Sequence, residues 1–147
     1  MKSKPILLIA LAAVAGCSDL PKDPDGTLDR VLRERQFRVG IVASRAGPAE
    51  PHRALVARVA AATGARPAIE QDAAERLLIR LEDGTLDLVL GEFEREGPWT
   101  TQVHIFPALA RGRAGSRETV VAAAAAPGEN GWIMLVDREA RALGAEP

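Results

Sequence analysis

The sequence of 147 residues has one cysteine, no tyrosine, only two tryptophans and three phenylalanines, and no excess of basic charge. A single cysteine excludes an internal disulfide framework and any metal site built from several cysteines. The formal net charge of −1 argues against a nucleic-acid-binding protein, which needs clustered positive charge to neutralise phosphates. The length suits one domain of ordinary size.

The one long apolar run lies at the N-terminus. Lys2 and Lys4 precede an uninterrupted apolar stretch over residues 6–15, and small residues follow it. This layout is typical of a bacterial secretory signal, and the run is too short for a permanent membrane-spanning helix. We therefore expect residues 1–16 to be a signal peptide.

The segment Val14-Ala15-Gly16-Cys17 resembles the lipobox of bacterial lipoproteins. The resemblance implies that Cys17 carries acyl chains, and several chains on one residue give a stable membrane anchor. Residues 17–25 then form the lipidated cysteine and a polar tether. The expected location is the periplasmic side of the cell envelope; Ser18 follows the cysteine, and the choice between inner and outer membrane stays open.

Helical and strand patterns alternate after the tether. Apolar residues at helical spacing predict helices over residues 27–35, 51–63 and 130–143. A further helix is expected after residues 72–75, which have the spacing of a capping box, with Asp72 at the cap. Strands are expected over residues 37–43, 66–70, 86–90, 103–106 and 118–126. Loops are expected over residues 91–101 and 111–117. The alternation predicts one α/β domain, residues 26–144, with a mostly parallel sheet between helices on both faces.

Three segments in this order resemble bacterial family 3 extracellular solute-binding proteins, the amino-acid-type receptors of ABC importers. They are residues 26–42, residues 77–91, where an Asp opens an apolar strand, and residues 103–107, which are similar to the hinge strand. Members of that family have two lobes, the second inserted after the hinge strand. Only residues 108–117 stand there in this chain, too few for a lobe. The resemblance therefore implies a single three-layer lobe, similar to lobe one of a type II periplasmic binding protein, with a role in transport or sensing.

Open α/β sheets bind ligands at the carboxyl ends of their strands, which here are the loops over residues 44–50 and 92–101. Trp99 could stack on a ligand, with Arg45 or Arg95 supplying charge; alternatively, Trp99 caps the core and the charges are solvated. The family typically clamps the ligand carboxylate with an arginine just before the hinge strand. Counting back from Val103 places Trp99 there, and an indole cannot replace that clamp. The candidate ligand-binding residues are Ser44, Arg45, Glu92, Arg95, Trp99, Thr100 and Thr101.

No other motif indicates chemistry. His52 and His104 have no metal-ligand spacing and are expected to be structural, and neither a nucleophile elbow nor a phosphate loop is present. We expect no catalytic residue, no metal, no cofactor and no nucleic-acid partner. The expected partners are the membrane, a small polar solute and a second chain that completes the cleft. The alternative function is a degenerate lobe that binds another envelope protein and has no small-molecule ligand.

Overall fold

The computed structural model describes residues 23–44, 49–94, 97–114 and 117–144. The helices are α1 (Thr27–Glu34), α2 (Glu50–Thr63), α3 (Ala74–Glu82), the 3-10 helix η1 (Pro98–Thr101) and α4 (Asn130–Gly144). The strands are β1 (Gln36–Val42), β2 (Arg66–Asp72), β3 (Leu88–Glu94), β4 (His104–Ile105), β5 (Ala110–Ala114) and β6 (Arg117–Ala125). Among the described residues, no helix combines the length and the apolar character needed to cross a membrane.

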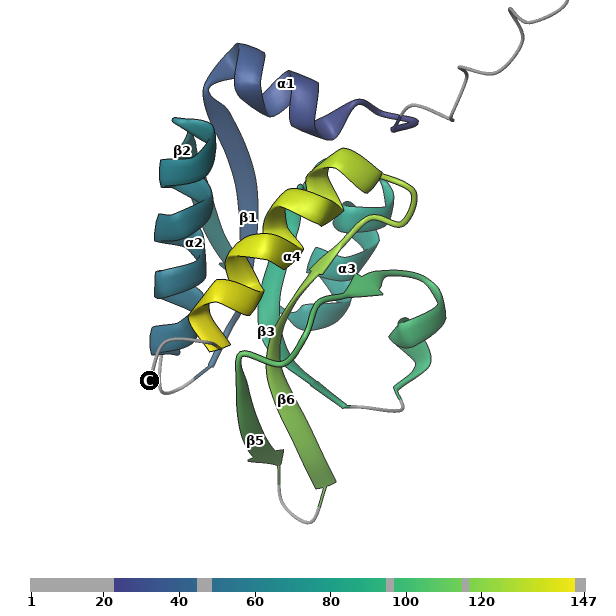
Figure 1. Cartoon of the computed structure of the whole chain (residues 1–147). Coiled ribbons are helices and arrows are strands. Elements are labelled where there is room, and N and C mark those ends of the chain that lie inside the picture. Colours follow the sequence, from purple (N-terminus) through teal and green to yellow (C-terminus); the bar gives the residue numbers. More distant parts are fainter. Residues whose placement is uncertain (1–22, 45–48, 95–96, 115–116, 145–147) are drawn as a thin grey trace, which may run out of the picture.

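The strands form one mixed sheet in the order β2-β1-β3-β6-β4, with β5 also paired to β6 (Figure 1). β1 pairs in parallel with β2 and with β3. β6 pairs antiparallel with β3, β4 and β5, so β6 alone runs against the other five strands. This confirms the predicted single α/β lobe with a mostly parallel sheet.

The two faces of the sheet carry different helices. α1, α2 and α4 cover one face and α3 covers the other (Figure 1). Strand alternation decides which side chains face each layer: Phe37, Val39 and Ile41 of β1 belong to the core under α2 and α4. Gly40 faces α3, where an added Cβ would lie 2.8 Å from Cδ2 of Leu77. Glycine at this position therefore allows α3 to approach β1 closely.

A buried tryptophan and a buried carboxylate connect the layers. Trp132 of α4 is 1% exposed, its ring centroid lies 5.9 Å from that of Phe37, and its Nε1 donates a hydrogen bond to the carbonyl of Asp87 at 2.7 Å. The Asp87 carboxylate accepts hydrogen bonds from the backbone N–H of Arg38 at 2.7 Å, from the Arg38 guanidinium at 2.6 Å, and from Arg30. The hydrogen bond to Asp87 raises the pKa of Arg38. Asp87 directly precedes β3, so this network lies at the amino end of that strand, opposite the expected site.

Three expectations about local structure are wrong. Residues 91–94 belong to β3 rather than to a loop, because Gly91 and Phe93 are buried while Glu92 and Glu94 are exposed, as on a half-buried strand. Part of the predicted basic loop at residues 111–117 is strand: Arg111 and Arg113 belong to β5, and Arg117 opens β6. Asp72 does not cap α3; Ala73 occupies the N-cap without a side-chain cap hydrogen bond, and Asp72 pairs with Arg76 instead.

Candidate functional site

The carboxyl ends of β1 and β3 lie at the same edge of the sheet, because the two strands are parallel neighbours with Ile41 opposite Leu90. Ser44 follows β1 at this edge and is exposed, and it takes part in a polar interaction. Glu92 lies near the end of β3 and is also exposed. The topology thus brings these two predicted site residues to one edge.

Glu92 has two neighbours that the sequence did not indicate. Thr119 of β6, the neighbouring strand, donates a hydrogen bond through its hydroxyl to Oε2 of Glu92 at 3.2 Å. The imidazole of His52, from the first turn of α2, lies close enough for the charge of Glu92 to oppose the lowering of its pKa by burial. We call Glu92, Thr119 and His52 the Glu92 cluster. An exposed carboxylate that a neighbouring strand holds in place is suited to binding a cation.

His52 is the unusual member of this cluster. It is 4% exposed, and its Nε2 is buried without a hydrogen-bond partner in the described part of the chain. Burial dominates and lowers the pKa of His52, whereas the backbone of Gly91 and of Ala122 and the charge of Glu92 act in the opposite direction. Burial under the edge of the sheet thus favours the neutral form of the ring.

Trp99 borders a cavity on the α3 side of the same edge. The cavity has a volume of about 260 Å³. Its lining comes from the first turns of α3, the end of β3, η1 and β4: Ala74, Leu78, Glu92, Phe93, Glu94, Gly97, Trp99 and Ile105. Trp99 is half-buried and packs against the core cluster under α3. Trp99 therefore covers the edge of the core and also lines a cavity, and its stacking on a ligand stays a prediction.

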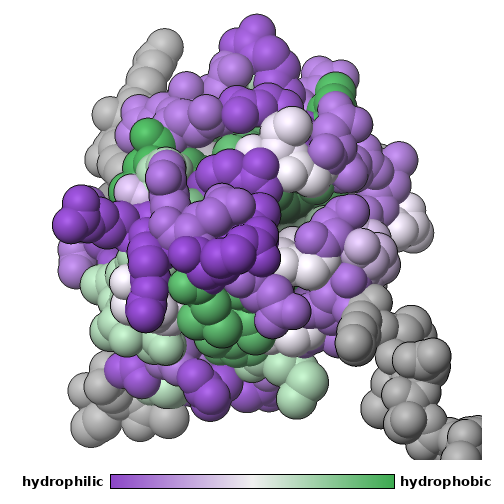
Figure 2. Space-filling model, turned by 90° about the horizontal axis from the view of Figure 1, so that it is seen from above, coloured by the Kyte–Doolittle hydropathy of each residue, from purple (hydrophilic) through white to green (hydrophobic). Residues whose placement is uncertain are grey.

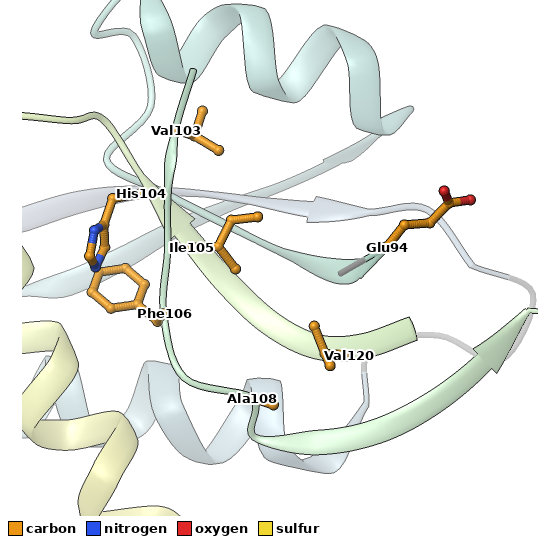
Figure 3. A pocket seen from close by; sticks show the side chains of 7 residues that line it. All are labelled: Glu94, Val103, His104, Ile105, Phe106, Ala108 and Val120. Carbon is orange, nitrogen blue, oxygen red and sulfur yellow. The ribbon is translucent and has the colours of Figure 1, made fainter. Parts of the chain in front are cut away.

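A second cavity of about 410 Å³ adjoins the first and shares Glu94 and Ile105 with it. Figure 3 shows Ile105 and Val120 on one side of the segment that runs from Val103 to Ala108, and the rings of His104 and Phe106 on the other. Those two rings meet edge to face with their centroids 4.9 Å apart. His104 thus packs against an aromatic ring beside this cavity.

The remaining predicted site residues are placed only in part. Arg45 and Arg95 lie outside the described residues. Thr100 lies in η1 through its backbone, and its side chain is outside the description; Thr101 is exposed and has an interaction partner. The structure thus brings Ser44, Glu92 and Trp99 to one end of the sheet. Within the described residues, no three His, Cys, Asp or Glu side chains gather as a metal site would require.

The alternation of buried and exposed positions in Gly91-Glu92-Phe93-Glu94 is a sequence signal that could have shown that β3 continues through these residues. His52 and Thr119, the two neighbours of Glu92 that the sequence did not indicate, carry no comparable signal. Thr119 lies near Glu92 because β3 pairs with β6, in a register that puts Glu92 opposite Val121. His52 lies near Glu92 because α2 packs on one face of the sheet.

Comparison with known sequences gave no relative: no family model matches the chain, and no curated protein matches it significantly. Comparison with solved structures gave several. A mutant of domain 1 from TmArgBP in its arginine-bound form has a TM-score of 0.66 and 17% identity, and the match covers 81% of this chain and 99% of that one.

Two further structures show the same likeness. The ancestral amino acid-binding protein AncCDT-1, described as a precursor of cyclohexadienyl dehydratase, has a TM-score of 0.67 and 9% identity over 82% of this chain and 94% of that one. A mutant of ArgBP from T. maritima has a TM-score of 0.65 and 8% identity over 80% of this chain and 93% of that one. At these identities the likeness establishes the fold: the chain has the fold of domain 1 of a periplasmic amino acid-binding protein.

Proposed function

We propose that this protein is a lipid-anchored solute-binding lobe of the bacterial envelope, which binds a small cationic solute at the carboxyl ends of β1 and β3. The anchor is Cys17, the signal peptide is residues 1–16, and the associated process is ABC-type transport or sensing. One observation supports this site. At this edge of the sheet, Glu92 is exposed, accepts a hydrogen bond from Thr119, and borders the cavity that Trp99 also lines.

The solute class follows from the charges at this edge. Glu92 and Glu94 both border the cavity, and both are exposed at the end of β3. Carboxylates pair with guanidinium and ammonium groups through charge-assisted hydrogen bonds. The fold neighbours support the same class, since one is an arginine-bound single domain. Arginine and lysine are accordingly the first solutes to test.

We propose binding rather than catalysis. The described residues that line the 260 Å³ cavity include Glu92, Glu94 and Trp99, but no serine, cysteine or histidine that could act as a nucleophile with its base. The fold neighbours support this choice, because they are mainly described as binding proteins.

The experiment is calorimetric titration of the mature domain, residues 18–147, with arginine, lysine and glutamate. We expect heat of binding with arginine or lysine and none with glutamate. Glu92→Gln removes the charge and keeps the shape, so it should abolish the binding, whereas the matched control Glu75→Gln changes an exposed carboxylate in α3 and should retain it. Binding that survives in Glu92→Gln would contradict the proposed site.

The second candidate is the degenerate lobe that binds another envelope protein. The 410 Å³ cavity favours it, because four of its seven lining residues are aliphatic: Val103, Ile105, Ala108 and Val120. Ile105→Asp and Val120→Asp would place a charge in that wall. Two results together would favour this function over the first. The parent protein would bind no solute, and an envelope protein that co-purifies with the parent would be lost from both variants.

A further inference from the structure

The chain enters the fold at a fixed point. The backbone N–H of Gly131, in the first turn of α4, donates hydrogen bonds to both carboxylate oxygens of Asp23, at 3.0 and 2.9 Å. Two residues later, the N–H of Asp25 donates to Oε1 of Glu129 at 2.8 Å. Asp23 and Asp25 fall within the segment predicted as a tether, yet both are bound to the domain. The length of chain free to act as a tether therefore ends before Asp23.

Only residues 18–22 separate Cys17 from Asp23. A fully extended residue advances the chain by at most about 3.6 Å, so the Cα atoms of Cys17 and Asp23 are at most roughly 22 Å apart. β3 has seven residues and by itself spans about 20 Å. The tether is thus about as long as the sheet, and the end of the domain where the chain enters is the part that a lipid on Cys17 always keeps within about 22 Å of the bilayer.

That end is opposite the proposed solute site. α1 crosses the end of the sheet at which β1 begins, and the chain from Asp23 enters beside it (Figure 1). We call α1, residues 23–26 and the first two turns of α4 the entry surface. Glu92 and Ser44 lie at the carboxyl ends of the strands, at the other end of the sheet.

The entry surface carries side chains that suit a lipid headgroup region. Met134 of α4 is 73% exposed and Leu32 of α1 is 42% exposed, and these are two of the four large apolar side chains exposed in the described chain. Arg33, next to Leu32, has a side chain that is 69% exposed and forms an ion pair with Glu34 at 3.6 Å. Figure 2 views this end and shows hydrophobic surface between hydrophilic side chains. Apolar side chains such as these enter the acyl boundary of a bilayer.

We propose that the entry surface rests on the bilayer that holds the Cys17 anchor, so that the solute site points away from the membrane. The occupant of this surface is lipid, because the short tether keeps the bilayer within reach and raises its effective concentration. This inference rests on the anchoring part of the proposed function. One consequence is that the solute site lies above the bilayer at a distance of roughly the length of the sheet, where a solute or a partner protein can reach it.

The test uses the full-length lipidated protein in vesicles of phosphatidylethanolamine and phosphatidylglycerol that contain a nitroxide-labelled lipid. Lipidation leaves no other thiol in the chain, so an introduced cysteine accepts a single fluorescent label. Met134→Cys places the label on the entry surface. Its matched control, Glu75→Cys, places the label on an exposed position in the first turn of α3, at the carboxyl ends of the strands.

We expect the nitroxide lipid to quench the label at position 134 several-fold more strongly than the label at position 75. Equal quenching, or stronger quenching at position 75, would overturn the orientation. Mass spectrometry and flotation with the vesicles test the anchor separately. A protein that lacks lipid and stays in solution would overturn the anchoring itself, and the two failures are thus distinguishable.

Discussion

The carboxylate of Glu129 accepts a hydrogen bond from the backbone N–H of Thr27 at 2.8 Å, although the two residues are 102 positions apart. Glu129 is 2% exposed and stands directly before α4, whereas Thr27 is the first residue of α1. The residue before α1, Gly26, provides no side-chain cap. Asp23 in turn binds the N–H of Gly131 in α4. Each of the two helices is therefore capped by a carboxylate from the segment that precedes the other.

We predict that Glu129→Ala destabilises the protein by about 1–3 kcal/mol, because backbone N–H groups at the start of α1 lose their acceptor in a buried place. Glu129→Gln keeps an acceptor oxygen and should cost less. Urea denaturation measures both. The matched control is Glu82→Ala, which removes an exposed glutamate at the end of α3. If Glu129→Ala unfolds at the same urea concentration as Glu82→Ala, the capping role is wrong.

Much of the fold could be predicted, because local signals agreed with it. Pro51 at the start of α2 and Gly64 after its end marked that helix correctly, and the alternation of Phe37, Val39 and Ile41 marked β1. β5 could not be predicted, since its glycine and alanines have low strand preference and the strand depends on its pairing with β6. For the candidate site, the sequence predicted that Ser44, Glu92 and Trp99 lie at the carboxyl ends of the strands, and the structure places them there. The contacts of Glu92 with His52 and Thr119 depend on tertiary structure alone.

We predict that replacing Asp87 lowers the stability of the protein more than replacing any other carboxylate of the described chain. Its side chain is 1% exposed and pairs with Arg30 and Arg38. Asp87→Ala leaves both guanidinium groups without this partner in a partly buried place, and breaking a buried ion pair in this way costs about 3–5 kcal/mol. The control is Asp72→Ala, which breaks an ion pair with Arg76 on the surface and should change stability far less. Denaturation curves that rank the two variants in the reverse order would contradict this assignment.

We also predict that the protein loses stability in mild acid because of His52. The folded state lowers the pKa of His52 below its ordinary value of about 6.5. Between the two pKa values, the unfolded chain binds a proton at His52 that the folded chain does not bind. The free energy of unfolding is therefore highest, as far as His52 is concerned, above the pKa of the unfolded state, and it falls as the pH decreases below that pKa.

His52→Leu removes this contribution. The free energy of unfolding, measured by urea denaturation between pH 7.5 and pH 5, should decrease less with falling pH in His52→Leu than in the parent protein. The largest slope that one such group can contribute is about 1.4 kcal/mol per pH unit. Identical slopes in the two proteins would show that His52 does not titrate differently on unfolding.

The last prediction concerns affinity. A two-lobed receptor closes over its ligand, excludes water and makes contacts from both sides. With a single lobe the solute stays partly exposed, and fewer contacts offset the entropy lost on association. We therefore expect the monomer to bind arginine with a dissociation constant of about 1 mM or weaker, and tighter binding should require a second chain that completes the cleft. Trp99 fluorescence can follow the titration, with Trp99→Phe as the control that retains the buried Trp132. Micromolar binding by a protein that sedimentation shows to be monomeric would mean that one lobe supplies enough contacts alone.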